Sequence, residues 1–326
     1  MIEWKCFELH THTLHSDGNF SVDELRARAK DFLYDGIALT DHNTMSGLDE
    51  LAGKAFFRVP EGIPVIPGIE WTTYYGHMLV IGADKYIDWR FVRADSIDDY
   101  TRAVKEAGGV IGIAHPFEMG SPMCTGCHWD FKVNEWKNID YIEVWSDEFP
   151  QKRYKNELAF SWWTELLNKG HRIAASAGWD WHGNSNDPVL PAATWLGLEN
   201  GVICTESVKE ALASGRTIIS AGPFPMVCLR RGESVFYPGD TLKQGRAGFF
   251  LAIDEDVRKK IWSSFGINPK RIIITHNGMP VKSFPCQSFI EEDLDLSPGW
   301  FRLEGYGDVE NVKDALIFFS SPWYVN

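Results

Sequence analysis

The chain has 326 residues, of which 44% are hydrophobic and 24% charged, a composition typical of a folded soluble protein rather than a disordered one. This length exceeds what a single compact core usually supports, so we expect one large domain and a smaller one. The formal net charge of -13 disfavours sequence-independent binding to duplex nucleic acid, because that binding depends on Lys and Arg side chains.

The sequence predicts a cytoplasmic protein. Its first residues lack the basic stretch, long apolar run and cleavage site of a signal peptide. No window approaches the roughly 20 apolar residues that are needed to cross a bilayer. The six cysteines are scattered along the chain, which favours reduced thiols over a disulfide scaffold.

The first part of the chain predicts an α/β fold in which strands and helices alternate. Ser21 and Glu24 form a capping box that begins the first helix. We expect strands at residues 4–9, 37–40, 65–66, 78–81, 110–114, 141–144 and 172–177, and helices at residues 21–34, 48–57, 97–107 and 154–167. This alternation implies a mostly parallel sheet, and its length to about residue 220 suits a barrel with active groups at the strand ends.

After Ala221-Gly222-Pro223 the pattern changes to short β-rich pieces broken by Gly and Pro. The expected strands are residues 226–229, 248–253, 271–275, 300–303 and 315–319. We therefore predict two domains, residues 1–220 and a small C-terminal β-sandwich at residues 221–326.

Side chains that bind metal ions recur where the strands of the first domain are predicted to end. His10 and His12 are two residues apart at the end of the first strand, so both imidazoles face the same side and can meet one cation. The full set of candidate metal ligands is His10, His12, Asp17, His42, Glu70, His77, His115, Asp180 and His182. A lone histidine at a strand end is more often structural, but nine such residues favour a metal site.

These motifs resemble the PHP (polymerase and histidinol phosphatase) superfamily over about residues 7–220. The motifs are His10-x-His12, Asp17, Asp41-His42-Asn43, Glu70, His77, His115 and Asp180-x-His182. The resemblance implies a distorted seven-stranded β/α barrel of PHP type with a two- or three-metal centre. Gly215-Arg216-Thr217 and the segment from Phe319 to Val325 further resemble the carbaryl-hydrolase-like subgroup, which carries a C-terminal β domain.

The resemblance also implies how the ligands divide among three ions. A first metal would be held by His10, His12, Glu70 and Asp180. Glu70 would bridge to a second metal held by His77 and His115, and a third would be held by Asp17, His42 and His182. Ala177-Gly178-Trp179 stands where the family commonly has Gly-Ser before the Asp, which leaves the ligand spacing intact but bears on the size of the substrate pocket.

The chemistry of such a centre is hydrolytic. A bound cation lowers the pKa of water to about 7, so we expect a metal-bridging hydroxide to attack phosphorus at neutral pH. A third cation would neutralise charge on the phosphoryl oxygens. The proton for the leaving oxygen would come from Asp41, His15 or Glu143. We predict Glu70, Asp41 and His42 as catalytic residues and zinc, manganese or iron as the metal, because all three accept nitrogen and oxygen ligands.

The predicted activity is that of a metal-dependent phosphoesterase acting on a small phosphomonoester, a nucleotide or an oligonucleotide end. One alternative is an ester or carbamate hydrolase with the same metal site. Another is a metal-dependent binding module without catalysis, although a site that had lost its catalytic activity would be expected to have lost some of its metal ligands. The expected partners are small phosphate esters, nucleotides or short single-stranded nucleic acid, and no membrane.

Other side chains are candidates for substrate binding. Trp179 and Trp181 flank a metal ligand and could stack on a base or an aromatic leaving group. Glu143 lies on the sixth predicted strand, and Arg153 and Lys155 after it could hold a second phosphate, although basic residues that begin a helix are usually solvated. Cys124-x-x-Cys127-His128 matches the pattern for covalent haem attachment, but nothing else supports it, so we expect a surface loop and no haem.

Overall fold

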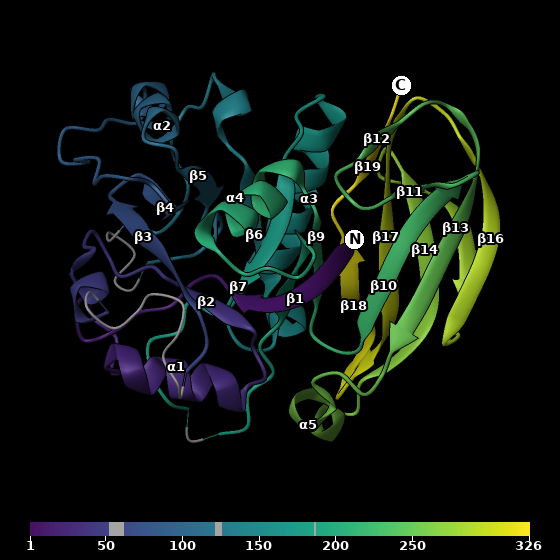
Figure 1. Ribbon diagram of the computed structural model, residues 1–326, viewed down its shortest axis with the longest axis horizontal. Helices are drawn as coiled ribbons and strands as arrows, with labels where there is room; N and C mark the ends of the chain where they lie inside the picture. The colour runs from purple at the N-terminus through teal and green to yellow at the C-terminus, as the bar shows by residue number, and fades with distance from the viewer. Residues whose placement is uncertain (52–61, 121–125, 186) are drawn as a thin grey trace.

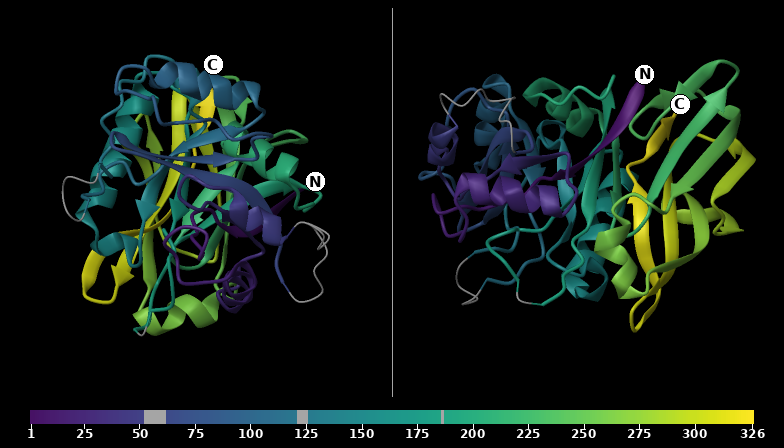
Figure 2. Two further views of the ribbon diagram at one scale, coloured as in Figure 1. Left: turned by 90° about the vertical axis from the view of Figure 1, so that its left-hand side faces the viewer. Right: turned by 60° about the horizontal axis from the view of Figure 1, so that its bottom comes forward.

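The computed structural model describes residues 1–51, 62–120, 126–185 and 187–326. Two parts of the chain lie side by side, a mixed α/β part on the left of Figure 1 and an all-β part on the right. The second panel of Figure 2 shows the same division from another direction.

The α/β part is built on seven strands that follow one another across the sheet. They are β1 (Ile2–Glu8), β2 (Gly36–Leu39), β3 (Val65–Thr73), β4 (Gly76–Ile81), β5 (Val110–Ile113), β6 (Tyr141–Ser146) and β7 (Ala174–Gly178). Every strand predicted in this part is present. The sheet is mixed, because β3, β4 and β5 pair antiparallel while the other neighbours pair parallel. The reversal is a tight turn that ends at Gly76, whose φ of 126° favours glycine.

The expected barrel does not close within the residues that the structure describes. The outer edge of β1 pairs antiparallel with β8 (Ala193–Glu199), a strand that the sequence did not predict, and not with β7. A single bridge joins Thr11, beyond β1, to Trp181, beyond β7. The ends of β1 and β7 therefore meet, although no ladder links the two strands.

Four longer helices accompany the sheet. They are α1 (Val22–Asp31), α2 (Ile97–Glu106), α3 (Tyr154–Asn168) and α4 (Thr205–Ser214). The capping box of Ser21 and Glu24 is formed as predicted. The helix expected at 48–57 is in its described part only a 3-10 turn, η1 (Ser46–Glu50), and residues 52–57 lie outside the described residues. Two further 3-10 turns are η3 (Trp136–Asn138) and η4 (Pro150–Lys152).

The C-terminal part contains all five strands predicted there and several more. One antiparallel sheet has the order β11 (Ser234–Phe236), β10 (Phe224–Arg231), β13 (Gly245–Asp254) and β16 (Phe289–Leu296). The other strands are β12 (Thr241–Leu242), β14 (Asn268–His276), β15 (Met279–Pro285), β17 (Gly299–Val309), β18 (Val312–Ser320) and β19 (Trp323–Val325). The turns α5 (Lys259–Trp262) and η5 (Ser263–Phe265) follow β13.

These strands form two layers, with β10 and β13 in front of β14 and β17 in Figure 1. Leu251 of β13 and Ile274 of β14 are fully buried and belong to the same hydrophobic core. The layers are thus held together by apolar side chains that both sheets turn inward.

The two parts share a sheet. β9 (Thr217–Ser220) pairs with β8 on one side and with β18 of the C-terminal part on the other, where Phe318 faces Ser220. The predicted boundary near residue 220 therefore falls between β9 and β10, and backbone pairing continues across it. Within the described residues, no helix is long and apolar enough to cross a membrane.

Candidate metal centre

The candidate ligands come together from six strands and the loops beyond them. His10 and His12 follow β1, His42 follows β2, and His115 follows β5. Glu70 instead lies inside β3 and His77 is the second residue of β4, so these two are not at strand ends as predicted. Since β3 and β4 are adjacent and antiparallel, their side chains still reach the same place.

Glu70 is at the centre of the cluster and is fully buried. Its Oε1 lies 2.8 Å from Nδ1 of His77 and 3.1 Å from Nε2 of His115. Its Oε2 lies 3.1 Å from Nε2 of His10 and 3.3 Å from Nε2 of His12. Oε2 also lies 2.8 Å from Nδ1 of His42, so the carboxylate faces two imidazoles with one oxygen and three with the other.

A first group of potential ligands is completed by Asp180. Its Oδ1 lies 3.2 Å from Nε2 of His10 and 3.1 Å from Nε2 of His12. The ligand atoms of His10, His12, Glu70 and Asp180 all lie within 4.8 Å of one another, as do those of Glu70, His77 and His115 in a second group.

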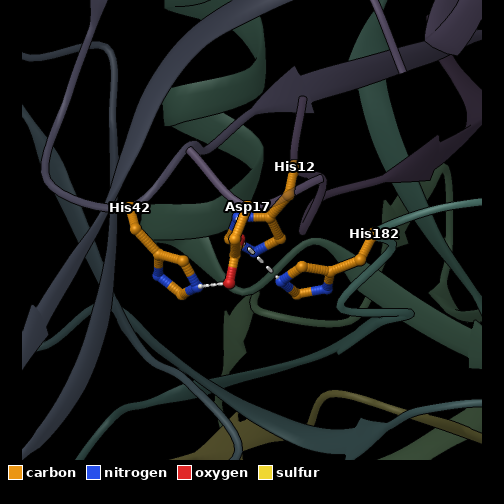
Figure 3. Close-up of side chains that lie close together, drawn as sticks. All are labelled: His12, Asp17, His42 and His182. Carbon is orange, nitrogen blue, oxygen red and sulfur yellow. Dashed lines mark ion pairs between the residues drawn. The ribbon is translucent and has the colours of Figure 1, made fainter. Parts of the chain in front are cut away.

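A third group consists of His12, Asp17, His42 and His182. Figure 3 shows the Asp17 carboxylate lying between the rings of His42 and His182. Its Oδ2 lies 3.4 Å from Nε2 of His42 and its Oδ1 lies 3.1 Å from Nε2 of His182. Asp17 is more exposed than the other ligands, so this group is on the solvent side of the cluster.

The orphaned atoms in the cluster fit bound cations. Six buried ligand atoms make no hydrogen bond, namely Nε2 of His10, His12 and His77, Nδ1 of His115, Oε2 of Glu70 and Oδ1 of Asp180. Buried polar atoms are rarely left without a partner. Two ligands on one tetrahedral zinc ion would be about 3.3 Å apart at usual bond lengths, close to the separations between the atoms of the first group. Nitrogen and oxygen donors are also the set that zinc, manganese and iron accept.

The electrostatics of the cluster keep its carboxylates anionic and two of its imidazoles neutral. Burial acts to raise the pKa of Glu70 and of Asp180, but the surrounding histidines, His10 foremost, together outweigh burial and hold both pKa values well below their ordinary range. Burial lowers the pKa of His77 and of His182. Anionic carboxylates and neutral imidazoles are the forms that bind metal ions.

Two ligands have backbone conformations that redirect their side chains. Asp180 has a φ of 56° and His115 a φ of 22°, values that non-glycine residues rarely adopt. Each lies just beyond the end of its strand, where an extended backbone would continue along the sheet. Such strain is commonly kept at functional sites, and here it is found at two members of the cluster.

Glu143 supports the cluster without belonging to it. Its Oε2 lies 2.9 Å from Nδ1 of His10 and therefore orients that ring with Nε2 toward Glu70. A Cβ on Gly178 would come within 2.3 Å of Glu143 Oε2 and 2.6 Å of His10 Cβ. Glycine at position 178 makes this contact possible.

The predicted catalytic residue Asp41 is engaged elsewhere. Its carboxylate accepts hydrogen bonds from the backbone N–H and the hydroxyl of Thr13 and from the hydroxyl of Ser16. His15, another candidate acid, bonds to Ser46 and Glu50. Both residues therefore fix the loop beyond β1.

Trp179 and Trp181 stack on each other with ring centroids 4.3 Å apart, and both contact Phe32. They line a cavity of about 600 Å³ that also involves Arg28 and Lys260. None of the nine candidate ligands lines that cavity. Their part in binding substrate remains a prediction.

Of the two basic residues after β6, Arg153 is half exposed and lies 3.7 Å from Asp147, whereas the Lys155 side chain is only 13% exposed. Cys124 of the haem-like motif lies outside the described residues, and Cys127 and His128 belong to a short segment before Trp129.

Sequence reasoning missed Glu8, which is fully buried beside the cluster. Its Oε1 accepts hydrogen bonds of 2.9 Å from the backbone N–H of His10 and of Trp179, and its Oε2 accepts one from Tyr34. Glu8 therefore ties the end of β1 to the end of β7, where no strand ladder does so. Burial raises its pKa to about 7. The sequence signal that could have identified Glu8 is its position two residues before His10, which places both side chains on the same face of the strand.

Comparison with known proteins agrees with this geometry. Residues 8–119 match the family model of the PHP domain. An uncharacterized protein of Methanocaldococcus jannaschii is 29% identical over 109 residues, which is 33% of this chain and 44% of that relative. The chain thus spans less than half the length of this curated relative.

A crystal structure from Bacteroides vulgatus, a two-domain protein containing a predicted PHP-like metal-dependent phosphoesterase, is similar with a TM-score of 0.53 and 13% identity. The similarity covers 98% of this chain and 95% of that one, so the two-part fold is shared. A provisionally assigned metal-dependent phosphoesterase from Bifidobacterium adolescentis has a TM-score of 0.40 and 18% identity over 63% of this chain and 95% of that chain.

Proposed function

We propose that this protein is a metal-dependent phosphoesterase of PHP type that hydrolyses a small phosphomonoester, a nucleotide or an oligonucleotide end. The observation that carries the proposal is the position of Glu70, whose Oε1 faces two buried imidazoles and whose Oε2 faces two more together with the half-buried ring of His42. A carboxylate in that position can be shared by two cations. The match of residues 8–119 to the PHP domain supports the same conclusion.

The residues of the chain have distinct parts in this proposal. His10, His12, Glu70 and Asp180 would hold a first ion, Glu70, His77 and His115 a second, and Asp17, His42 and His182 a third, with His12 near enough to contribute to the last. When bound, divalent cations supply a water of lowered pKa and neutralise charge on the phosphoryl oxygens. The burial of Glu70 and His10 keeps bulk water from competing for these ligands.

The carbaryl-hydrolase-like subgroup is part of the proposal. Its support is the C-terminal set of antiparallel strands and the shared two-part fold of the Bacteroides vulgatus protein. Membership of that subgroup makes ester or carbamate hydrolysis the competing activity.

The test compares three substrates. Hydrolysis of 4-nitrophenyl phosphate, bis(4-nitrophenyl) phosphate and a naphthyl carbamate is measured after removal of metal and after addition of manganese or zinc. We expect metal-dependent turnover of the monoester. Turnover of the carbamate with inert phosphates would overturn the proposal in favour of a carbamate hydrolase.

The Glu70→Gln variant tests the shared carboxylate in the same assay. It should lose activity and at least one equivalent of bound metal, as measured by elemental analysis. Glu206→Gln, on the exposed surface of α4, is the matched control and should retain both. Full activity and metal content in Glu70→Gln would show that the bridging assignment is wrong.

A further inference from the structure

A lysine beside the metal cluster lies in a setting that the proposed ligands do not explain. Lys155 is the second residue of α3, and its side chain is only 13% exposed. Its Nζ lies 2.7 Å from Oδ2 of Asp147 and also contacts the carboxylate of Glu118. Buried lysines are uncommon without a structural or functional reason.

The two carboxylates connect this lysine to the metal cluster. Glu118 is three residues after His115, and its backbone N–H donates to the carbonyl of His115. Asp147 directly follows β6, the strand of Glu143, and has a φ of 68° that redirects it from the strand. The loops beyond β5 and β6 therefore hold Lys155 at the edge of the second group of ligands.

The ammonium group has capacity left for a ligand. It has three N–H donors, and Asp147 and Glu118 take two of them. Within the described residues, the third has no partner. Burial lowers the pKa of Lys155 to about 8, although the charge of Asp180 acts on it in the opposite direction.

The other candidates for a proton donor are committed to structural contacts. Asp41 accepts three hydrogen bonds from Thr13 and Ser16, and Glu143 accepts one from His10. His15 is bonded at both ring nitrogens. Compared with these groups, Lys155 is a largely buried proton donor with an N–H still to offer.

We propose that Lys155 is the general acid of the reaction and protonates the leaving oxygen of the phosphate ester. The inference rests on the proposed phosphoesterase function and deepens it. Water adds its oxygen to phosphorus as the bond from phosphorus to the leaving oxygen breaks, and that oxygen takes a proton from Nζ of Lys155. The proton lost by the attacking water then restores the ammonium, so the products are an alcohol and inorganic phosphate. Asp147 and Glu118 are the positioning residues that hold the ammonium in place.

If Lys155 is a general acid, the effect of replacing it should depend on the leaving group of the substrate. A general acid contributes about 10²–10⁴-fold to the rate when the leaving group is a poor one. A nitrophenolate leaves readily without a proton, whereas a phenolate or an alkoxide gains much more from protonation. An ammonium that only binds phosphate would assist all esters equally.

The experiment measures kcat/KM for 4-nitrophenyl phosphate, phenyl phosphate and an alkyl phosphate with manganese or zinc. We expect Lys155→Gln to lose about 10²–10⁴-fold on the phenyl and alkyl esters and far less on the nitrophenyl ester. Lys155→Arg keeps the positive charge but is a poor acid, so it should show the same selective loss. Lys152→Gln is the matched control, because Lys152 pairs with Glu310 of the C-terminal part.

The outcomes separate the possible roles of Lys155. Equal losses on all esters, or recovery in Lys155→Arg, would show a binding cation and overturn the inference. A drop in the thermal midpoint or in the metal content of Lys155→Gln would mean that its loss of activity comes from a disturbed structure. Lys155→Arg then decides between a general acid and a binding cation. If the wild-type protein hydrolyses no phosphate ester, the proposed function itself fails. If it hydrolyses phosphate esters and the Lys155 variants are as active as the wild type, only the inference about Lys155 fails.

Discussion

Glu143 Oε2 lies 2.9 Å from Nδ1 of His10, and both side chains are fully buried. The contact fixes which ring nitrogen of His10 is turned toward Glu70 and Asp180. A carboxylate bonded to the second nitrogen of a metal-binding histidine also increases the basicity of that ligand.

Replacement of Glu143 should therefore weaken metal binding without removing a ligand. We expect Glu143→Ala to lower the affinity for the first metal about 10–100-fold, with a smaller loss in Glu143→Gln, which can still accept the hydrogen bond. Competition with a chromophoric chelator measures the affinity. Unchanged affinity in both variants would mean that this contact does not support the metal site.

Gly178→Ala should disturb the same contact from the opposite side. The added Cβ would lie 2.3 Å from Glu143 Oε2 and 2.6 Å from His10 Cβ, so one side chain must move. We expect a loss of about 1–3 kcal/mol in the free energy of unfolding together with lower metal content.

Gly232→Ala is a suitable control for Gly178→Ala, because Gly232 has a φ of 58° and no heavy atom near its added Cβ. Backbone strain should destabilise this control while its metal content stays at the wild-type level. The same metal content in both variants would argue against a special role for Gly178.

Metal affinity should rise with pH. Although burial opposes it, the nearby carboxylates of Asp180 and Glu70 raise the pKa of His12 to about 9, and Glu70 and Glu143 raise the pKa of His10 well above its ordinary value. Both rings are therefore protonated at pH 7 in the metal-free protein, and a cation must displace those protons.

Lowering the pH below about 9 should weaken binding by up to about tenfold per pH unit for each proton displaced. The measurement is chelator competition between pH 6 and 9, with proton release followed in weak buffer. Affinity that is independent of pH, with no proton release, would contradict the raised pKa values.

A buried ion pair of β17 lies at the contact between the two parts. Arg302 Nε lies 2.8 Å from Glu304 Oε1, and the arginine also donates to the hydroxyl of Thr164 on α3. Arg302→Leu would leave the Glu304 carboxylate buried without its cation. We expect a loss of about 3–5 kcal/mol in the free energy of unfolding, measured by urea denaturation.

The double variant Arg302→Leu/Glu304→Leu should be markedly more stable than Arg302→Leu alone, because it leaves no unpaired charge. Arg246→Leu, which breaks an exposed pair with Asp293, is the control and should change stability little. A double variant as unstable as the single one would show that packing, rather than charge, dominates at this contact.

Local signals in the sequence were read correctly. The hydrogen bonds of the Ser21 capping box join residues three apart, so neighbouring residues are enough to predict them. The His10-x-His12 pair and the other candidate ligands could be chosen because metal binding needs particular side chains. The ligands beyond β1, β2, β5 and β7 converge because strand ends meet at one edge of a sheet, whereas Glu70 and His77 are brought there by the antiparallel pairing of β3 and β4.

The missed elements depend on contacts between distant residues. β8 is buried on both faces over most of its length, so it lacks the alternation that identifies a strand, and it pairs with β1 almost 200 residues earlier. That pairing occupies the edge of β1 that a closed barrel would need. Likewise, the roles of Glu8 and Lys155 come from neighbours that no short motif contains.

The pairing of β9 with β18 has a consequence for attempts to dissect the protein. In a fragment that ends at residue 220, β9 would be an unpaired edge strand. Its backbone N–H and C=O groups that now face Phe318 and Ser320 could then pair with a strand of another molecule. Such a fragment would tend to self-associate, so the α/β part is best produced together with the C-terminal strands that cover β9.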